Sequence, residues 1–446
     1  MKQDKFTLMT ETPVEALVCR LSVPSIIIML ISSLYNMADT YFVGSLGTSA
    51  VAAVGVVFPL MAVIQALGFL FGQGSGNYIS RALGAKHTEK AAKMAATGFF
   101  SALILGALLS GLGLIYAVPL ASALGATPTI LPYAAEYMRF ILIGMPWMAG
   151  SLTLNNQLRF QGSSFYGMIG MLSGAVLNMI LDPLCIFVLG LGIKGASLAT
   201  MISQGVGCSV LFAGSFRNGN IGVRASNFSP SRSHYREILR GGIPSLLRQG
   251  LMSAMTIVIN RFAAVYGDAA LAAISIVNRV CMFANSAVLG VGQGFQPVCG
   301  FNYGAKRYDR VRQAFWFCVR LVSAGLTLIC IILAVFAPQI IALFRKGDPA
   351  VISIGARSLR LQCIGLPFTS WQVLCNMMVQ TMGKSLQASF LALSRQGLFL
   401  LPFLLLFTPF WGLLGIQISP MASNIASFFV AVPLGIKILR EMKETP

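Results

Sequence analysis

Two acidic residues lie deep inside long apolar stretches of the sequence, where a carboxylate needs a reason to be present. Asp39 falls in the apolar stretch 21–43, and Asp182 falls in the stretch 165–189. A third acid, Glu136, lies near the start of the stretch 132–154, close to Arg139, and is interpreted as marking a membrane interface. An ionised carboxylate in hydrocarbon costs several kcal/mol, so such a residue faces a cavity, pairs with a partner, or takes up a proton. A medium of low dielectric also favours the neutral form of a carboxyl group. Both residues are therefore candidates for carrying a proton or Na⁺, and a purely structural role as hydrogen-bonding acids stays open.

Polar side chains accompany both acids at helical spacing. Tyr35 lies four residues before Asp39, and Asn178 lies four residues before Asp182, so each pair shares one helix face. Other polar groups occur in the first, fourth and sixth apolar stretches: Asn36, Asn155, Asn156 and Thr200. Each alone is typical of contacts between membrane helices. Together they predict a hydrated pocket within the N-terminal half.

The apolar stretches of the second half carry no acid and several arginines. Arg261 and Arg279 are the hardest of these to explain as side chains that reach back to the membrane surface. We expect both to line a substrate cavity, with Met252 and Met282 as an adaptable apolar wall and Asn36 from the first half. Ordinary helix packing is the alternative for the methionines. An arginine that faces the cavity would favour an anionic or zwitterionic substrate.

The elements that position these residues are membrane helices. The chain has 446 residues, of which 10% are charged and 56% hydrophobic, and its mean hydropathy is +0.77. A typical soluble domain has about 25% charged residues, so a soluble enzyme, a nucleic-acid-binding domain and a disordered protein are excluded. Because a spanning helix needs about 20 apolar residues, the sequence predicts an all-α integral membrane protein. Its twelve apolar stretches are 21–43, 51–78, 94–118, 132–154, 165–189, 193–214, 241–266, 271–298, 313–337, 352–379, 386–408 and 412–436.

The distribution of basic residues predicts the orientation. Most of the 32 Lys and Arg residues fall in the two tails and in the loops after every second stretch. The opposite loops carry Lys194, Arg345 and Lys346. By the positive-inside rule, both termini are expected to face the cytoplasm. We expect a multi-pass protein of the bacterial plasma membrane, and the net charge of +19 then reflects basic cytoplasmic loops.

The two halves of the chain repeat one another at an offset of about 220 residues. The matching pairs include Pro24-Ser25 with Pro244-Ser245, Gly72-Gln73-Gly74 with Gly292-Gln293-Gly294, and Gly84-Ala85-Lys86 with Gly304-Ala305-Lys306. Six stretches in each copy is an even number, so the repeats are parallel and related by an axis along the membrane normal. We expect an N-terminal six-helix lobe over 1–214, a basic cytoplasmic linker over 215–240, and a C-terminal six-helix lobe over 241–446, around a central cavity. Two such lobes suit alternating access.

The sequence does not indicate disulfide bonds, a transition-metal site or nucleotide binding. The nine cysteines are an odd number without a CxxC pair, and the two histidines, His87 and His234, lie in basic loops. We therefore expect no disulfide frame and no metal site beyond Na⁺ at the two acids. No nucleotide-binding domain is present, so an ion gradient is the expected energy source and no cofactor is required.

The chain resembles the multidrug and toxic compound extrusion (MATE) family over nearly its whole length. The matching segments are Pro24-Ser25, Asn36-Met37-Ala38-Asp39-Thr40, Gly84-Ala85, Asn178 with Leu181-Asp182-Pro183, and Ile243-Pro244-Ser245. The resemblance is strongest to the bacterial branch with acids in spans 1 and 5. It implies that a pocket in the N-terminal lobe handles the coupling ion, through positions that match Tyr35, Asp39, Asn155, Asn178, Asp182 and Thr200. Other branches use acids of the second lobe, which this chain lacks.

The resemblance implies secondary active efflux of cationic or amphipathic small molecules, driven by entry of H⁺ or Na⁺, and no enzymatic activity. Two alternatives are left by the sequence. A flippase of a lipid-linked oligosaccharide or another anionic amphiphile would use the arginines of the second half. A non-transporting receptor or scaffold would show no ion-dependent flux. The expected partners are small amphipathic substrates and the lipid bilayer, without nucleic acid, and a duplicated chain can build its cavity as a monomer.

Overall fold

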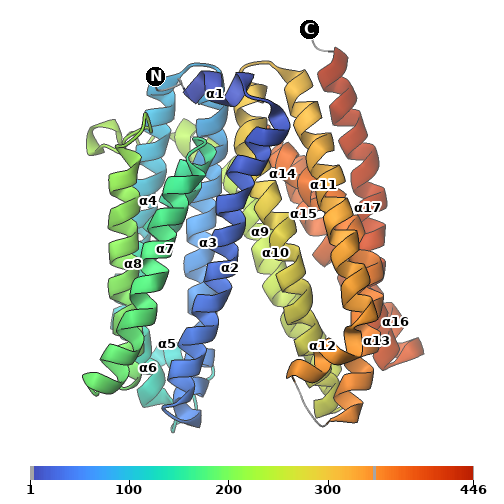
Figure 1. The fold of residues 1–446 in the computed structure, drawn as a ribbon. Helices are drawn as coiled ribbons and strands as arrows, with labels where there is room; N and C mark the ends of the chain where they lie inside the picture. The colour runs from blue at the N-terminus through green and yellow to red at the C-terminus, as the bar shows by residue number, and fades with distance from the viewer. Residues whose placement is uncertain (1–4, 345–347, 445–446) are drawn as a thin grey trace. The chain divides into compact units, whose positions relative to one another are not determined.

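The computed structural model describes residues 5–344 and 348–444, apart from the side chains of residues 33, 34, 36–38, 40, 48 and 444. All regular elements of this described part are helical (Figure 1). The first half contains α1 (Lys5–Glu11), α2 (Val14–Gly44), α3 (Thr48–Gly84), α4 (Thr88–Ile115), α5 (Ala117–Ala123), α6 (Leu131–Phe160), α7 (Ser164–Pro183), η1 (Leu184–Val188), α8 (Ile193–Ser215) and η2 (Ala225–Asn227). The second half contains α9 (Arg232–Ala264), α10 (Asp268–Gly304), α11 (Tyr308–Val335), α12 (Ala337–Phe344), α13 (Pro349–Gly365), η3 (Leu366–Phe368), α14 (Thr369–Thr381), α15 (Ser385–Leu393), η4 (Ser394–Leu400), α16 (Leu401–Trp411) and α17 (Leu413–Glu444).

The predicted twelve-helix membrane fold is confirmed. Ten helices of the described residues are long and apolar enough to cross a membrane. The remaining two predicted stretches form α6 and the interrupted run of α13, η3 and α14. These two are the fourth span of each repeat, and both bury polar side chains, such as Gln157 in α6 and Gln372 in α14. Polar side chains lower the apolarity of α6, whereas η3 divides the other span into α13 (17 residues) and α14 (13 residues), each shorter than the roughly 20 residues of a spanning helix.

The backbone repeats as the sequence does. Positive φ angles recur at equivalent positions: Gly47 (108°) and Gly267 (96°), Lys86 (59°) and Lys306 (59°), Gly192 (56°) and Gly412 (55°). Each pair is separated by 220 residues. The short helices α5 and α12 also occupy equivalent places, since Ala117 and Ala337 begin them. The duplication is therefore one of turns and helix ends as well as of apolar stretches.

The contacts divide the chain into two compact units. Unit 1 comprises residues 1–11 and 23–242, and unit 2 comprises residues 12–22 and 243–446. The expected linker, 215–240, is thus part of unit 1, and the first residues of α2 are part of unit 2. Both long helices that change units do so just before a proline, at Pro24 in α2 and Pro244 in α9.

Within unit 1, glycines allow α7 and α8 to approach closely. A Cβ atom on Gly174 of α7 would lie 3.1 Å from the backbone oxygen of Ser203, and one on Gly207 of α8 would lie 3.2 Å from that of Gly170. Small residues at such a crossing let van der Waals packing hold membrane helices together. Because the two helices run antiparallel, the next turn of α7 brings Asn178 to Thr200.

Candidate functional site

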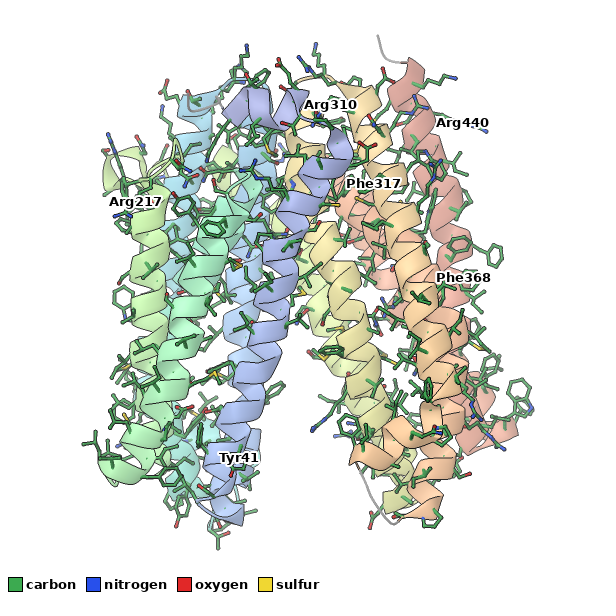
Figure 2. All side chains as sticks on the ribbon, viewed as in Figure 1. Tyr41, Arg217, Arg310, Phe317, Phe368 and Arg440 are labelled. Atoms are coloured by element: carbon green, nitrogen blue, oxygen red, sulfur yellow. The ribbon has the colours of Figure 1, made fainter. Side chains whose placement is uncertain are left out.

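The two membrane acids lie in the same part of unit 1. Asp182 is fully buried (0% exposed) near the end of α7, and Asp39 is partly buried on α2. They are close enough for the charge on one to act on the other. In Figure 2, Tyr41 marks the end of α2 and lies at the opposite end of unit 1 from Arg217. Asp39, two residues before Tyr41, therefore lies toward the end of the unit that is far from the basic residues after α8.

Neither carboxylate is neutralised by a basic side chain. No ion pair among the described residues includes Asp39 or Asp182. One carboxylate oxygen of Asp39, Oδ1, is buried and has no hydrogen-bond partner in the described part of the chain. The site thus holds two mutually repelling acids, and one of them has an oxygen still free to bind.

Asn178, which Thr200 holds in place, satisfies part of the hydrogen-bonding capacity of the Asp182 carboxylate. The amide of Asn178 is assigned by its surroundings: its nitrogen donates to Asp182 Oδ2 at 2.9 Å. Its oxygen accepts from the backbone nitrogen of Thr200 at 3.2 Å and from Thr200 Oγ1 at 3.3 Å. Asn178 therefore links α7 to α8 and fixes the carboxylate of Asp182 between them.

Two tyrosines complete the polar surroundings of the acids. Tyr35 of α2 is hydrogen-bonded to Thr200. Tyr137 of α6 is buried and close enough to Tyr35 and to both carboxylates to interact with them electrostatically. Tyr137 carries no signal in the sequence, because no acid lies at helical spacing from it on the same face. Only the packing of α6 against its neighbours places it there.

The local backbone at Asp182 is irregular. Pro183 has no N–H to donate to the preceding turn, and α7 ends at this residue. The chain continues as the π-helical η1, in which the nitrogen of Leu189 donates to the oxygen of Leu184 at 2.9 Å. Single π-helical turns are frequent at functional sites. Asp182 thus occupies the junction of two helix types, where the spacing of side chains changes.

A cavity of about 160 Å³ adjoins this cluster inside unit 1. At roughly 30 Å³ per molecule it has room for about five waters. Tyr35 lines it one helical turn from Asp39, and Gly174 lines it about two helical turns from Asp182. Its lining residues are Ile28, Ile31, Ser32, Tyr35, Met61, Ile64, Gln65, Met148, Leu152, Met168, Met171, Leu172, Gly174, Ala175 and Gln204. Four of them are methionines, whose flexible side chains adapt to different contents.

The structure does not bring every predicted site residue to the cluster. Asn155 of α6 lies against Gly167, since a Cβ atom there would be 2.9 Å from Asn155 Nδ2. Gly167 is eleven residues before Asn178 on α7, roughly 16 Å along the helix at 1.5 Å per residue. The role of Asn155 in ion coupling therefore stays a prediction without a contact to the acids. The side chain of Asn36 lies outside the described residues.

The predicted cavity residues of the second half belong to unit 2. Arg261 and Arg279 are exposed on α9 and α10, as is Met282, while Met252 is partly buried. None of the four lines the cavity of unit 1. Their contact with a substrate stays a prediction.

Comparison with known proteins shows the family to which the chain belongs. A family model described as MatE matches residues 24–184 and 244–406. The multidrug export protein MepA of Staphylococcus haemolyticus is 29% identical over 435 residues, covering 97% of this chain and 95% of that protein. A solved structure described as the outward-facing conformation of a multidrug resistance MATE family transporter of the MOP superfamily is 28% identical, with a TM-score of 0.93 and full coverage of both chains.

A second solved structure is that of a MOP superfamily transporter from Pyrococcus furiosus, for which a reversed polarity of the binding pocket is described as suggesting a different function. It is 28% identical, with a TM-score of 0.92 and full coverage of both chains. Taken together, these relatives favour multidrug efflux over the flippase alternative. They also make this chain a multi-pass transporter in the bilayer and not an enzyme.

Proposed function

Because the chain belongs to the MATE family of multidrug efflux transporters, we propose that it exports cationic amphipathic compounds by antiport with H⁺ or Na⁺. The observation that carries this proposal is the pair of acids without a basic partner beside a methionine-lined cavity. A proton or Na⁺ that enters the pair removes the repulsion between its charges. The oxygens of Asp39, Asp182, Thr200 and Tyr35 are the hard ligands that suit either ion.

Helix α2 links the ion to the substrate. It carries Asp39, and it also carries Tyr35 and three other residues of the cavity wall: Ile28, Ile31 and Ser32. A change of charge at Asp39 therefore acts on the helix that the substrate touches. A cavity of about 160 Å³ is smaller than the roughly 300–1,000 Å³ of most ligand sites. Substrate binding thus requires the wall to move, and movement of α2 supplies the link that antiport needs.

The driving force is sufficient for useful export. A membrane potential of 100 mV supplies about 2.3 kcal/mol for each full charge that crosses. We propose that the ion enters from outside, that the substrate leaves as the acids take up the ion, and that the transporter then opens inward by alternating access. The monomer in the bacterial plasma membrane, with both termini in the cytoplasm, is the expected working form.

The test is transport of the cationic dye rhodamine 123 in proteoliposomes, with a pH gradient and a sodium gradient imposed separately. Asp39→Asn and Asp182→Asn remove the charge with little change of shape, so each is expected to abolish gradient-driven uptake. Asp268→Asn is the matched control, because Asp268 is an exposed acid at the start of α10. Full gradient-driven transport by both of the first two variants would remove the carboxylates from coupling.

A further inference from the structure

Unit 2 contains two arginines for which the proposed antiport has no use. Arg248 lies on α9 and Arg395 in the π-helical η4, within two of the membrane-spanning segments. Both side chains are partly buried, and the two guanidinium groups are close enough to repel each other. Arg248 donates from Nη1 to Asn376 Oδ1 at 3.2 Å. Two like charges are thus held near each other inside unit 2.

No acid of the described residues neutralises them. Neither arginine takes part in an ion pair there. The described acids of unit 2 lie at or near helix ends: Glu15, Asp268, Asp309, Asp348 and Glu441. Arginine stays protonated in proteins, so the pair has no means of shedding its charge. Each guanidinium at membrane depth costs about 2.5–3.5 kcal/mol on insertion scales, and a bound anion offsets part of that cost.

The repeat indicates where in the fold the pair lies. At the offset of 220, Arg248 corresponds to Ile28, which lines the cavity of unit 1. Arg395 corresponds to Ala175 at the same offset, or to Gly174 at the offset of 221, and both of these residues line that cavity. Cys281, whose thiol is close enough to Arg395 to interact with it, corresponds to Met61 of the same wall. The arginines therefore replace apolar wall residues at the positions where unit 1 has its cavity.

We propose that Arg248 and Arg395 form an anion-binding subsite in unit 2 that takes the carboxylate of a zwitterionic amphipathic substrate. The proposal extends the proposed export function and rests on it for the kind of molecule bound. Two planar guanidinium groups suit a carboxylate, because each presents a fork of N–H donors to its oxygens. This subsite would extend the substrate range beyond simple cations.

Rhodamine 110 and rhodamine 123 test the proposal as a matched pair, since the second is the methyl ester of the first and lacks its free carboxylate. Binding of each dye is measured by fluorescence polarisation on the full chain in phosphatidylcholine nanodiscs. We expect Arg248→Gln and Arg395→Gln to weaken rhodamine 110 about tenfold or more, as loss of hydrogen bonds to a charged group would. Binding of rhodamine 123 is expected to change less than about twofold, well under the 1.4 kcal/mol of a tenfold effect.

Three further variants separate the effects of charge, of fork geometry and of general damage to the protein. Arg248→Lys and Arg395→Lys retain the charge without the planar fork and are expected to recover part of the affinity. Arg357→Gln removes an exposed arginine from α13 of the same unit and is expected to leave both dyes unaffected. Equal weakening of both dyes, or no effect on either, would overturn the proposal.

The phosphate of a lipid headgroup could bind the same two arginines as a substrate carboxylate. A second lipid composition distinguishes these two ligands. If rhodamine 110 binding is unchanged in the variants while they lose retained phosphatidylglycerol from mixed nanodiscs, the anion is a lipid headgroup and the substrate proposal fails. A failure of the proposed ion coupling would appear in the transport assay and not in the dye-binding assay, because dye binding requires no ion gradient. Asp39→Asn and Asp182→Asn report on coupling, whereas the arginine variants report on the carboxylate.

Discussion

At the scale of single residues, the site depends on what Asp39 and Asp182 lack. A basic neighbour would hold both carboxylates permanently charged and paired, and ion uptake would then have little effect. Instead they face polar neutral groups, in which Asn178 donates to Asp182 while one oxygen of Asp39 has no partner among the described residues. Neutral partners tolerate both the empty and the ion-bound state. This is the property that a coupling site requires.

Tyr137 is expected to tune ion binding without being needed for the fold. Tyr137→Phe removes one hydroxyl close enough to interact with both acids, and the loss of such a polar interaction is expected to cost roughly 0.5–1.5 kcal/mol, the range of one hydrogen bond. The ion concentration for half-maximal transport should therefore shift by about two- to tenfold. Tyr133→Phe is the control, because Tyr133 lies one turn earlier on α6 and is 44% exposed. Equal ion dependence in the two variants would exclude Tyr137 from the site.

At the scale of helices, close packing of α7 on α8 sets the distance between Asn178 and Thr200. Gly207→Val would place side-chain atoms against the backbone of Gly170, whereas nothing lies within 4 Å of a Cβ atom at Gly205. We expect Gly207→Val to lower the thermal unfolding temperature in detergent, at a cost of about 1–3 kcal/mol for overpacking. Gly205→Val carries the same change in helix propensity and should leave that temperature nearly unchanged. An equal decrease in both would show that propensity, and not the crossing, is responsible.

The short helix α1 gives a prediction for pH. Lys5 Nζ donates to Ser163 Oγ at 2.8 Å and also contacts Asn220, and burial lowers the pKa of Lys5 from 10.5 to about 8. Between about pH 8 and pH 10.5, Lys5 is therefore more protonated when α1 is undocked than when α1 is docked. Docking should strengthen as the pH rises through this window, because the stability gain follows the excess of protons in the undocked state.

Limited proteolysis between pH 7.5 and 10.5 measures this docking. At each pH, the rate of cleavage within residues 5–13 is measured for the wild type and for Lys5→Gln. Taking the ratio of the two rates cancels the pH dependence of the protease itself. The ratio of wild-type to variant cleavage should fall as the pH rises. A ratio that stays constant or rises would contradict the assignment.

At the scale of the whole molecule, an even number of spans requires both termini to lie on one side of the membrane. The basic loops predict that this side is the cytoplasm. Green fluorescent protein fused to either end should therefore fluoresce, and alkaline phosphatase fused to either end should be inactive. Phosphatase activity at one end only would mean an odd number of spans. Activity at both ends would reverse the orientation.

Much of the architecture could be predicted from local sequence. The lengths of the apolar stretches predict the spans, and the matches at an offset of 220 predict a duplication that recurs in the backbone at Gly192 and Gly412. The spacing of Tyr35 to Asp39 and of Asn178 to Asp182 identifies four residues of the cluster. These features depend on composition and on the period of a helix, which are properties of the chain itself.

Which helices face each other, and at which turn, was decided only by tertiary structure. Tyr137 joins the acids and Asn155 lies elsewhere, although both are polar residues of α6, because they occupy different turns of that helix. Arg248 and Arg395 are 147 positions apart, and only the packing of unit 2 brings their charges together. Helix rotation and crossing depend on contacts between residues distant in sequence, such as Gly174 with Ser203, and no local pattern of polarity encodes them.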